Sequence, residues 1–167
     1  MLANMENRLT PLLIVRDATR ALDFYVRAFN AKELVRYLNN LNGTISHADL
    51  SVGDSVFSIT EEARDWNSDA PTSLGGSPVV LQLAVGDVDA AVGTMCNAGA
   101  SIVFPVQQFC GDRMARLRDP FGHLWVLSQR IEELSTEEKQ QRRDALFARL
   151  RSKPEAQPSS SIKPEDE

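Results

Sequence analysis

The chain has 167 residues, of which 43% are hydrophobic and 25% charged, and this favours one globular domain with a sizeable core. Its net charge of −5 argues against a nucleic-acid-binding face, which needs a surplus of Lys and Arg. No apolar run approaches the ~18–20 residues of a membrane span, and the first ten residues do not resemble a secretory signal. Cys96 and Cys110 lack the number and spacing of a disulfide framework or zinc site. We therefore expect a cytoplasmic protein with no nucleic-acid or membrane partner.

An internal repeat organises most of the chain. Residues 9–31 and 79–100 each open with a mostly apolar run of strand length and continue with a helix-period stretch. Between the two parts stands an aspartate, Asp17 in the first copy and Asp87 in the second. An aspartate there can accept a hydrogen bond from the first free amides of a helix, so both are predicted N-caps.

Each copy then continues with three further strands. Residues 44–60 and 112–128 both read as strand, tight turn and strand, with Gly53 and Gly122 supplying the turn. One more predicted strand precedes each of these hairpins. The sequence thus predicts an α+β fold in which two βαβββ modules form a half-open groove of eight β-strands.

The segments outside the two modules differ from them in composition. The linker is rich in Gly, Pro, Ser and Asp, which is typical of a loop. Ser135 and Glu138 form a predicted capping box at the start of a mixed-charge helix, and the last residues have the Pro, Ser and charge content of a disordered tail. The predicted organisation is a domain at 1–130 (module one 8–60, linker 61–78, module two 79–130), a C-terminal helix at 131–152 and a disordered tail at 153–167.

Four phrases of the sequence carry a family resemblance: VRDATRALDFYVRAFNA, AVGDVDAAVGTMCNAGA, HADLSVGDS and GDRMARLRDPFGHLWVL. In this order, and twice repeated, they resemble the glyoxalase/bleomycin-resistance/extradiol-dioxygenase superfamily, also called vicinal oxygen chelate. The last two phrases are similar to its PhnB-like branch. The resemblance covers residues 8–130 and implies the half-closed β arrangement, while one fold of this kind hosts many chemistries.

The resemblance also implies a place for a divalent metal, held by His, Glu or Gln side chains from the first and last strands of each module. None of the residues at those positions is a good ligand for such an ion, which needs carboxylate, imidazole or several oxygens. We therefore predict no metal and no cofactor, with a divalent ion at a displaced site as the alternative. The positions in this chain are Thr10 or Pro11, Phe57 or Ser58, Val80 and Val126.

The two histidines receive different interpretations. His123 follows the turn glycine, so we expect a turn residue whose imidazole bonds the backbone around Asp119–Gly122 rather than a metal ligand. His47 lies inside a predicted strand and points either into the groove or away from it. It is a candidate for contact with a ligand or, in the alternative, a metal ligand; otherwise it is a hydrogen-bonded residue of the sheet.

Four aromatic residues and one arginine complete the candidate site. Phe57 and Trp125 belong to the last strands of their modules, and Phe104 precedes a turn; each either lines the groove or belongs to the core. Trp66, in the linker, is predicted to cover the groove or to pack on a second subunit. Arg113 could clamp a carboxylate or phosphate, or form an ion pair with Asp49 or Asp119.

These observations favour a metal-free protein that binds a small, aromatic or cationic molecule. The alternative is a metal-dependent enzyme resembling a glyoxalase, epimerase or dioxygenase, and lyase or dioxygenase activity is the weaker of the two hypotheses. The resemblance implies a homodimer. The predicted ligand-binding residues are His47, Phe57, Trp66, Phe104, Arg113 and Trp125.

Overall fold

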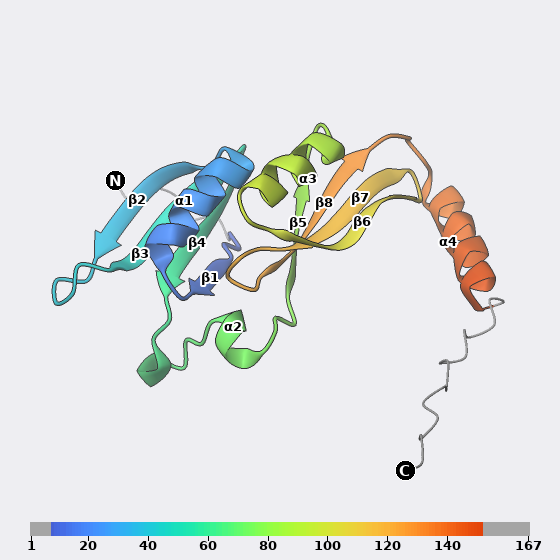
Figure 1. Cartoon of the computed structure of the whole chain (residues 1–167). Helices are drawn as coiled ribbons and strands as arrows, with labels where there is room; N and C mark the ends of the chain where they lie inside the picture. Colours follow the sequence, from blue (N-terminus) through green and yellow to red (C-terminus); the bar gives the residue numbers. More distant parts are fainter. Residues whose placement is uncertain (1–7, 152–167) are drawn as a thin grey trace, which may run out of the picture.

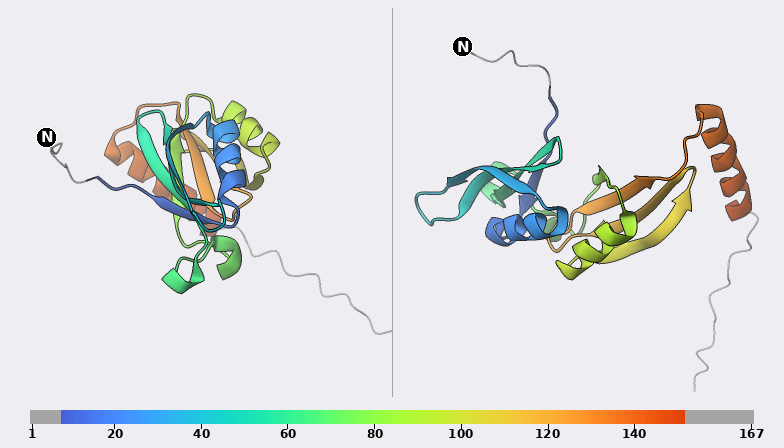
Figure 2. Two further views of the ribbon diagram at one scale, coloured as in Figure 1. Left: turned by 90° about the vertical axis from the view of Figure 1, so that its left-hand side faces the viewer. Right: turned by 90° about the horizontal axis from the view of Figure 1, so that it is seen from above.

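The computed structural model describes residues 8–151, which form two four-stranded sheets, each with one long helix packed on one face (Figure 1). The predicted disordered tail at 153–167 lies outside the described residues. The two sheets lie side by side, and their helices occupy the same side of the molecule and pack against each other (Figure 2). The α+β architecture of two repeated modules is confirmed.

Module one contains a sheet with the strand order β1-β4-β3-β2. The pair β1–β4 is parallel, because helix α1 carries the chain from β1 back across the sheet before β2 begins, and the other pairs are antiparallel. The elements are β1 (Leu12–Val15), α1 (Ala18–Phe29), β2 (Lys32–Leu38), β3 (Ile45–Val52) and β4 (Ser55–Glu61).

Module two repeats this topology, with the strand order β5-β8-β7-β6 and a parallel pair β5–β8. The sequence repeat therefore corresponds to a structural repeat. The elements are β5 (Val80–Ala84), α3 (Val88–Asn97), β6 (Ser101–Phe109), β7 (Asp112–Arg118) and β8 (Leu124–Arg130).

The two helices that pack on the sheets, α1 and α3, begin at the predicted aspartates. A carboxylate oxygen of Asp17 accepts a hydrogen bond from the amide of Arg20, and Asp87 accepts one from Ala90, each at 3.0 Å. In module one Glu61, at the end of β4, adds a second carboxylate, which accepts the amides of Asp17 and Ala18 at 2.7 Å each. The first amides of α1 are thus satisfied by two acidic groups, which also complement the helix dipole.

The linker is more ordered than its composition predicts. It holds a short 3₁₀ turn, η1 (Arg64–Trp66), and a one-turn helix, α2 (Pro71–Leu74). Pro71 stands at the first position of α2, where a proline costs no hydrogen bond, and the carboxylate of Glu62 accepts the amide of Ala70 just before it. Local capping therefore gives this Gly- and Ser-rich segment a defined path.

The C-terminal helix α4 (Thr136–Arg151) begins directly after the predicted cap Ser135, within the predicted segment 131–152. The capping box is confirmed, because Glu138 accepts the amide of Ser135 at 2.8 Å and the Ser135 hydroxyl accepts the amide of Glu138 at 3.2 Å. The residues between β8 and α4 approach the turn between β6 and β7, where the amides of Ile131 and Glu132 donate to the carbonyl of Gly111. Within residues 8–151, no helix has the length and apolar character needed to cross a membrane.

The core fills the space between the helices and the sheet faces that they cover. Its large, fully buried members include Phe24 and Tyr25 of α1, Met95 of α3 and Leu127 of β8. Within the described residues, no helix covers the opposite faces of the two sheets, which we call the open faces. A row across the first open face consists of Leu12, Ser58, Asp49 and Val35, and the corresponding row of the second consists of Gln82, Val126, Arg116 and Phe104.

Candidate functional site: an aromatic pocket between the modules

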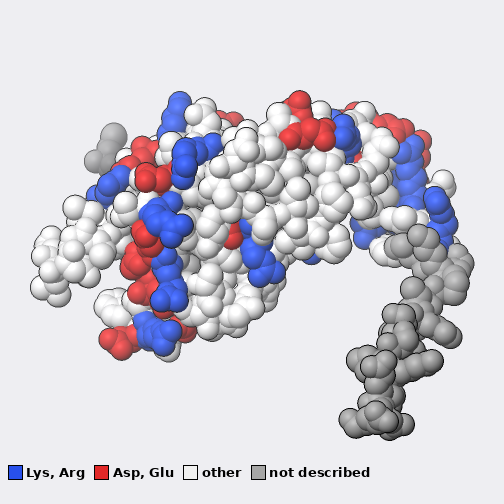
Figure 3. All heavy atoms as spheres, in the orientation of Figure 1, with Lys and Arg blue, Asp and Glu red and all other residues white. Residues whose placement is uncertain are grey.

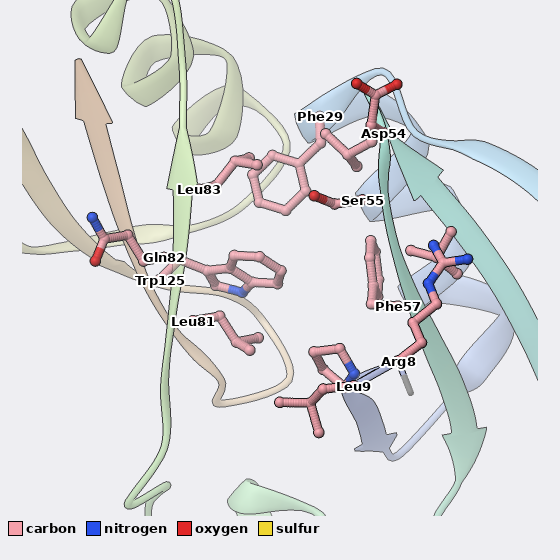
Figure 4. Close-up of a pocket in the computed structure, with 13 residues that line it drawn as sticks. Arg8, Leu9, Phe29, Asp54, Ser55, Phe57, Leu81, Gln82, Leu83 and Trp125 are labelled. Atoms are coloured by element: carbon pink, nitrogen blue, oxygen red, sulfur yellow. The ribbon is translucent and has the colours of Figure 1, made fainter. Parts of the chain in front are cut away.

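A pocket of about 360 Å³ opens between β4 of module one and β5 and β8 of module two. Three aromatic rings project into it from different elements: Phe29 from the end of α1, Phe57 from β4 and Trp125 from β8 (Figure 4). Leu81 and Leu83 of β5 add apolar surface on the same side as Trp125, across from Phe57. Because both modules contribute, the pocket exists only where they meet.

The helix period and the strand alternation explain how these rings converge. Phe29 lies one turn after Tyr25 on α1, and the two rings stack with their centroids 5.9 Å apart. The Trp125 indole lies 4.7 Å from the Phe29 ring and 6.1 Å from the Phe57 ring. Phe57 and Trp125 also occupy matching positions of the last strands of their modules, so the structural repeat brings one aromatic from each side.

The polar groups of the pocket lie around this aromatic interior. Arg8, Asp54 and Ser55 line it, with the Asp54 carboxylate at its edge and the Arg8 side chain beyond the Phe57 ring (Figure 4). Gln82 points to the other side of β5, where its amide donates to the hydroxyl of Ser128 at 3.4 Å. The pocket therefore offers ring faces and aliphatic surface to a ligand, with one acidic and one basic side chain to orient it.

A buried aspartate, Asp119, contacts the pocket residue Trp125 through a hydrogen bond. Asp119 is 3% exposed, and its Oδ2 accepts hydrogen bonds from the Tyr25 hydroxyl at 2.7 Å and from the indole Nε1–H of Trp125 at 3.0 Å. Its Oδ1 accepts the backbone amides of Phe121 and His123, at 2.9 Å each. Burial raises the pKa of Tyr25 well above its ordinary value, and the charge of Asp119 raises it further.

His123 is a turn residue, as predicted, but the prediction for its ring was wrong. The ring Nε2 lies 3.0 Å from the carbonyl oxygen of Ile14 in β1, so the imidazole reaches the other module and not its own turn. The carboxylate of Asp119 takes the role expected of the imidazole, because two amides of the turn donate to it. A carbonyl oxygen can only accept, so Nε2 carries a proton.

A second polar group of residues lies on the first open face. His47 Nε2 is 2.9 Å from Asp49 Oδ1, and the hydroxyl of Ser58 donates to the same oxygen at 2.5 Å. The hydrogen bond from Ser58 holds the pKa of the Asp49 carboxyl below its ordinary value, and His47 lowers it further. The Asp49 carboxylate thus orients the imidazole, whereas the serine hydroxyl contacts the carboxylate and not the histidine. Because Ser58 is bonded to the carboxylate and not to the imidazole, the group lacks the serine–histidine contact of a serine nucleophile.

The remaining predicted residues are dispersed. Arg113 pairs with Asp89 of α3 at 2.8 Å, so the expected pairing with Asp49 or Asp119 was wrong. Phe104 is 57% exposed on β6, with the guanidinium of Arg116 5.7 Å from its ring centroid. Trp66 is 83% exposed on η1 and is not among the residues that line the pocket.

Of the six predicted ligand-binding residues, the pocket unites two, Phe57 and Trp125. Phe29, Leu81 and Leu83 were missed as pocket residues. Their periodicity marked them as apolar positions of a helix and a strand, but only the packing of one module on the other places them on a shared space. No sequence signal indicated the hydrogen bond from Tyr25 to Asp119, because the two residues are 94 positions apart.

The expected metal positions do not offer a suitable donor set. On the first sheet Ser58 contributes one hydroxyl, which is already bonded to Asp49, and on the second Val80 and Val126 are hydrocarbon. In the part of the chain that the structure describes, no three His, Cys, Asp or Glu side chains gather in a group that could hold a metal ion. The residues present therefore do not fit the divalent ion that the resemblance implies.

Comparisons with known proteins agree on the family. The model of the Glyoxalase/Bleomycin resistance protein/Dioxygenase superfamily matches residues 7–127. An uncharacterized protein of Mycobacterium tuberculosis is 41% identical over 142 residues, which cover 83% of this chain and 83% of that protein.

Solved structures show the same fold. TioX from Micromonospora sp. ML1 is 29% identical with a TM-score of 0.57, covering 77% of this chain and all of that chain. The fosfomycin resistance protein FosX from Listeria monocytogenes, solved with Mn(II) and sulfate, is 17% identical with a TM-score of 0.60, covering 83% of this chain and 98% of that one. The family model spans both βαβββ modules, and the chain therefore belongs to the glyoxalase/bleomycin resistance protein/dioxygenase superfamily.

Proposed function

We propose that this protein binds a small, flat aromatic molecule without a metal ion, in the pocket between the two modules. The observation that carries the proposal is the convergence of Phe29, Phe57 and Trp125 on one space of about 360 Å³. Aromatic rings supply a large contact area and accept a flat ligand by stacking or edge-to-face packing. A pocket of this size matches small-molecule sites, which are mostly apolar with a few polar groups.

The net charge of the chain and the aromatic lining of the pocket support a cationic ligand over an anionic one. The chain has a net charge of −5, and the faces of aromatic rings attract cations. On the face of the molecule seen in Figure 3, basic and acidic side chains are intermixed over module one, whereas basic side chains gather at α4, outside the two modules. Among the described residues that line the pocket, Arg8 and Asp54 carry opposite charges, so the lining itself adds no net charge for an anionic group.

The test is a titration with proflavine, a flat cationic dye, and with 8-anilinonaphthalene-1-sulfonate (ANS), an anionic one. We expect proflavine to bind at one site per chain and to bind more tightly than ANS. Trp125→Leu should weaken proflavine at least about tenfold, which corresponds to ~1.4 kcal/mol of lost ring contact. Trp66→Leu is the comparison variant: a loss there and not at Trp125 would place the ligand under the linker and contradict the pocket.

The metal-free part of the proposal has its own measurement. The protein is purified without chelator, and nickel, zinc, manganese and iron are titrated by calorimetry. A silent titration is expected, because the family's metal positions offer valine and a bonded serine. Stoichiometric binding that disappears in His47→Ala would instead support the enzyme hypothesis.

One observation keeps an enzymatic function as the second candidate. His47 is held by Asp49 on a partly exposed surface, with its Nδ1 on the side of the ring away from that hydrogen bond. A carboxylate-oriented imidazole can act as a general base near neutral pH. A glyoxalase-, epimerase- or dioxygenase-like activity that is abolished by His47→Gln, with proflavine binding unchanged, would assign the chemistry to the first open face.

We also propose a homodimer, in which the open faces cover each other. Tyr37 is 60% exposed beside the first open face and Phe104 is 57% exposed on the second, and exposed apolar surface of this kind marks interaction sites. Asp49 and Arg116 occupy matching positions in the two rows and carry opposite charges, which would complement each other between copies. We further propose that the chain belongs to the PhnB-like branch, which the phrases HADLSVGDS and DPFGHLW support. We also propose a cytoplasmic location, which the two unpaired thiols support.

A further inference from the structure

Trp125 lines the pocket although it is only 5% exposed, and the one hydrogen-bond donor of its indole is already used. Nε1–H donates to Asp119 Oδ2 at 3.0 Å, and Asp119 is 3% exposed. An indole has no other polar group. What remains for a ligand is therefore a flat apolar surface.

The carboxylate that holds the indole is itself held on both oxygens. Two backbone amides of its own turn fix Oδ1, and the Tyr25 hydroxyl shares Oδ2 with the indole. Hydrogen bonds to a charged group in a buried setting are among the stronger ones in proteins. Asp119 is consequently an anchor with little freedom, and it can impose an orientation on the ring that it contacts.

We propose that Asp119 is the positioning residue of the aromatic pocket. It fixes the plane of Trp125 against Phe29 and Phe57, and it removes the indole N–H from ligand recognition. The inference rests on the proposed function and says how the pocket recognises its ligand. The aromatic rings select a flat ligand that is attracted to their faces. The ligand needs no hydrogen-bond acceptor directed at Trp125. Flat aromatic cations are the class that this surface suits best.

The link to Tyr25 explains why the anchor must be a buried carboxylate. Tyr25 belongs to module one and Trp125 to module two, and one oxygen of Asp119 accepts hydrogen bonds from both. The two hydrogen bonds to this oxygen therefore set both the plane of the Trp125 ring and the distance between the modules on either side of the pocket. A ring held only by packing could turn about its side-chain bonds, and the pocket would then lose its defined width.

The first experiment uses the full-length protein labelled with ¹⁵N in its two indoles, with a Trp66→Phe sample to assign the signals. Trp66 is 83% exposed and serves as the reference within the same molecule. We expect the Trp125 indole proton to exchange with solvent on the order of a hundredfold more slowly than that of Trp66. Equal exchange rates would show that the hydrogen bond does not hold the ring and would overturn the proposal.

The second experiment measures proflavine affinity in Asp119→Asn, with Asp87→Asn as a matched control far from the pocket. The asparagine keeps one oxygen for the turn amides of Phe121 and His123 but turns an NH₂ group toward the indole. We expect an affinity about tenfold weaker, together with fast exchange of the Trp125 indole proton, and no change in Asp87→Asn. A folded Asp119→Asn protein with a freely exchanging indole and unchanged affinity would contradict the positioning role.

A second variant covers the case in which Asp119→Asn does not fold. In the Trp66→Phe background, biosynthetic replacement of Trp125 by benzothienylalanine keeps the size of the ring and replaces its N–H by sulfur. The proposal expects the same tenfold loss of proflavine affinity, and full affinity would overturn it.

The outcomes also separate this inference from the proposed function. If neither proflavine nor ANS bound the wild-type protein, the binding function would fail, and the role of Asp119 in ligand recognition would fail with it. Slow exchange of the Trp125 indole in that case would leave Asp119 only as a link between modules. If proflavine bound and the Trp125 indole proton exchanged fast, the binding pocket would be supported and the positioning role of Asp119 would be rejected.

Discussion

The hydroxyl of Tyr25 and the carboxylate of Asp119 lie 2.7 Å apart although the residues are separated by 94 positions. Tyr25 is on the helix of the first module and Asp119 on the last turn of the second. The ring of His123 adds a second polar contact of the same kind, with the carbonyl of Ile14. The two modules are therefore joined by directed hydrogen bonds as well as by the apolar core.

Removing the Tyr25 hydroxyl should destabilise the whole chain. Tyr25→Phe keeps the buried ring but removes a donor to a charged acceptor, and we expect a free energy of unfolding lower by about 1.5–3 kcal/mol. Urea unfolding followed by circular dichroism measures it. Tyr37→Phe, on an exposed ring, should change the same quantity by less than about 0.5 kcal/mol. Equal effects of the two substitutions would show that the buried hydrogen bond contributes nothing.

The stability should also depend on Tyr25 at alkaline pH. Burial and Asp119 raise the pKa of Tyr25 in the folded chain above that of the unfolded chain, which is about 10. Its contribution is therefore complete below pH ~10 and is lost as the pH rises above that value toward the folded pKa. Urea unfolding between pH 8 and 11 should show the stability gap between wild type and Tyr25→Phe closing above pH ~10. A gap that stayed constant over this range would contradict the raised pKa.

The hydrogen bond from Ser58 should set the titration of Asp49. The pKa of Asp49 is lowered in the folded chain, so its contribution to stability is present above the unfolded pKa of ~3.9 and is lost as the pH falls through the folded value. Ser58→Ala should raise the pKa of Asp49, as measured by carboxyl ¹³C NMR, and move acid unfolding to higher pH. His47→Ala should raise it by a smaller amount. The reverse order of the two variants would show that the histidine dominates.

A close backbone approach should make Gly111 intolerant of a side chain. A Cβ there would lie 2.9 Å from the carbonyl oxygen of Glu132 and 3.0 Å from a methyl carbon of Leu134, at a φ of +90°. Gly53→Ala is the matched control, because its φ is also positive, at +55°, but open space surrounds the site. We expect Gly111→Ala to lower the free energy of unfolding by about 1–3 kcal/mol more than Gly53→Ala, as measured by chemical denaturation. Similar losses would mean that backbone strain alone acts at both sites.

The proposed dimer should be sensitive to charge on the second open face. Phe104→Glu places a carboxylate on surface that a second copy would bury, and an unpaired buried charge is strongly unfavourable. Light scattering coupled to gel filtration should report a dimer for the wild type and a monomer for the variant. Trp66→Glu, on the exposed linker turn, should remain dimeric. A monomeric wild type would reject the dimer, and a dimeric Phe104→Glu would move the interface elsewhere.

The fold could be predicted from the sequence because its signals are local and occur twice. Asp17 and Asp87 each stand between a strand and a helix, and both proved to be N-caps. The capping box of Ser135 and Glu138 was equally visible. Composition did not predict the two short helical turns of the linker, because single residues define the one at α2: Pro71 begins it, and Glu62 accepts the amide of Ala70 just before it.

The candidate site was less predictable because it depends on contacts between modules. Phe57 and Trp125 could be found from their matching positions in two strands, whereas Phe29 enters the pocket only through the packing of α1. The ring of His123 was assigned to its own turn, since its partner Ile14 lies 109 positions away. Sequence periodicity predicts on which face of a helix or strand a residue lies, but tertiary packing decides which residues that face contacts.

The contact between Tyr25 and Asp119 has no counterpart by repeat symmetry. Counted from the N-cap aspartates, Met95 stands in the second helix where Tyr25 stands in the first. Counted from the strand pairs Leu50–Phe57 and Leu117–Trp125, Val52 stands where Asp119 does. Two copies of the same half would each lack one member of the pair. If the polypeptide were severed within the linker, each fragment should thus bind the unlike fragment in preference to a second copy of itself, because only the unlike pair forms the hydrogen bond between Tyr25 and Asp119.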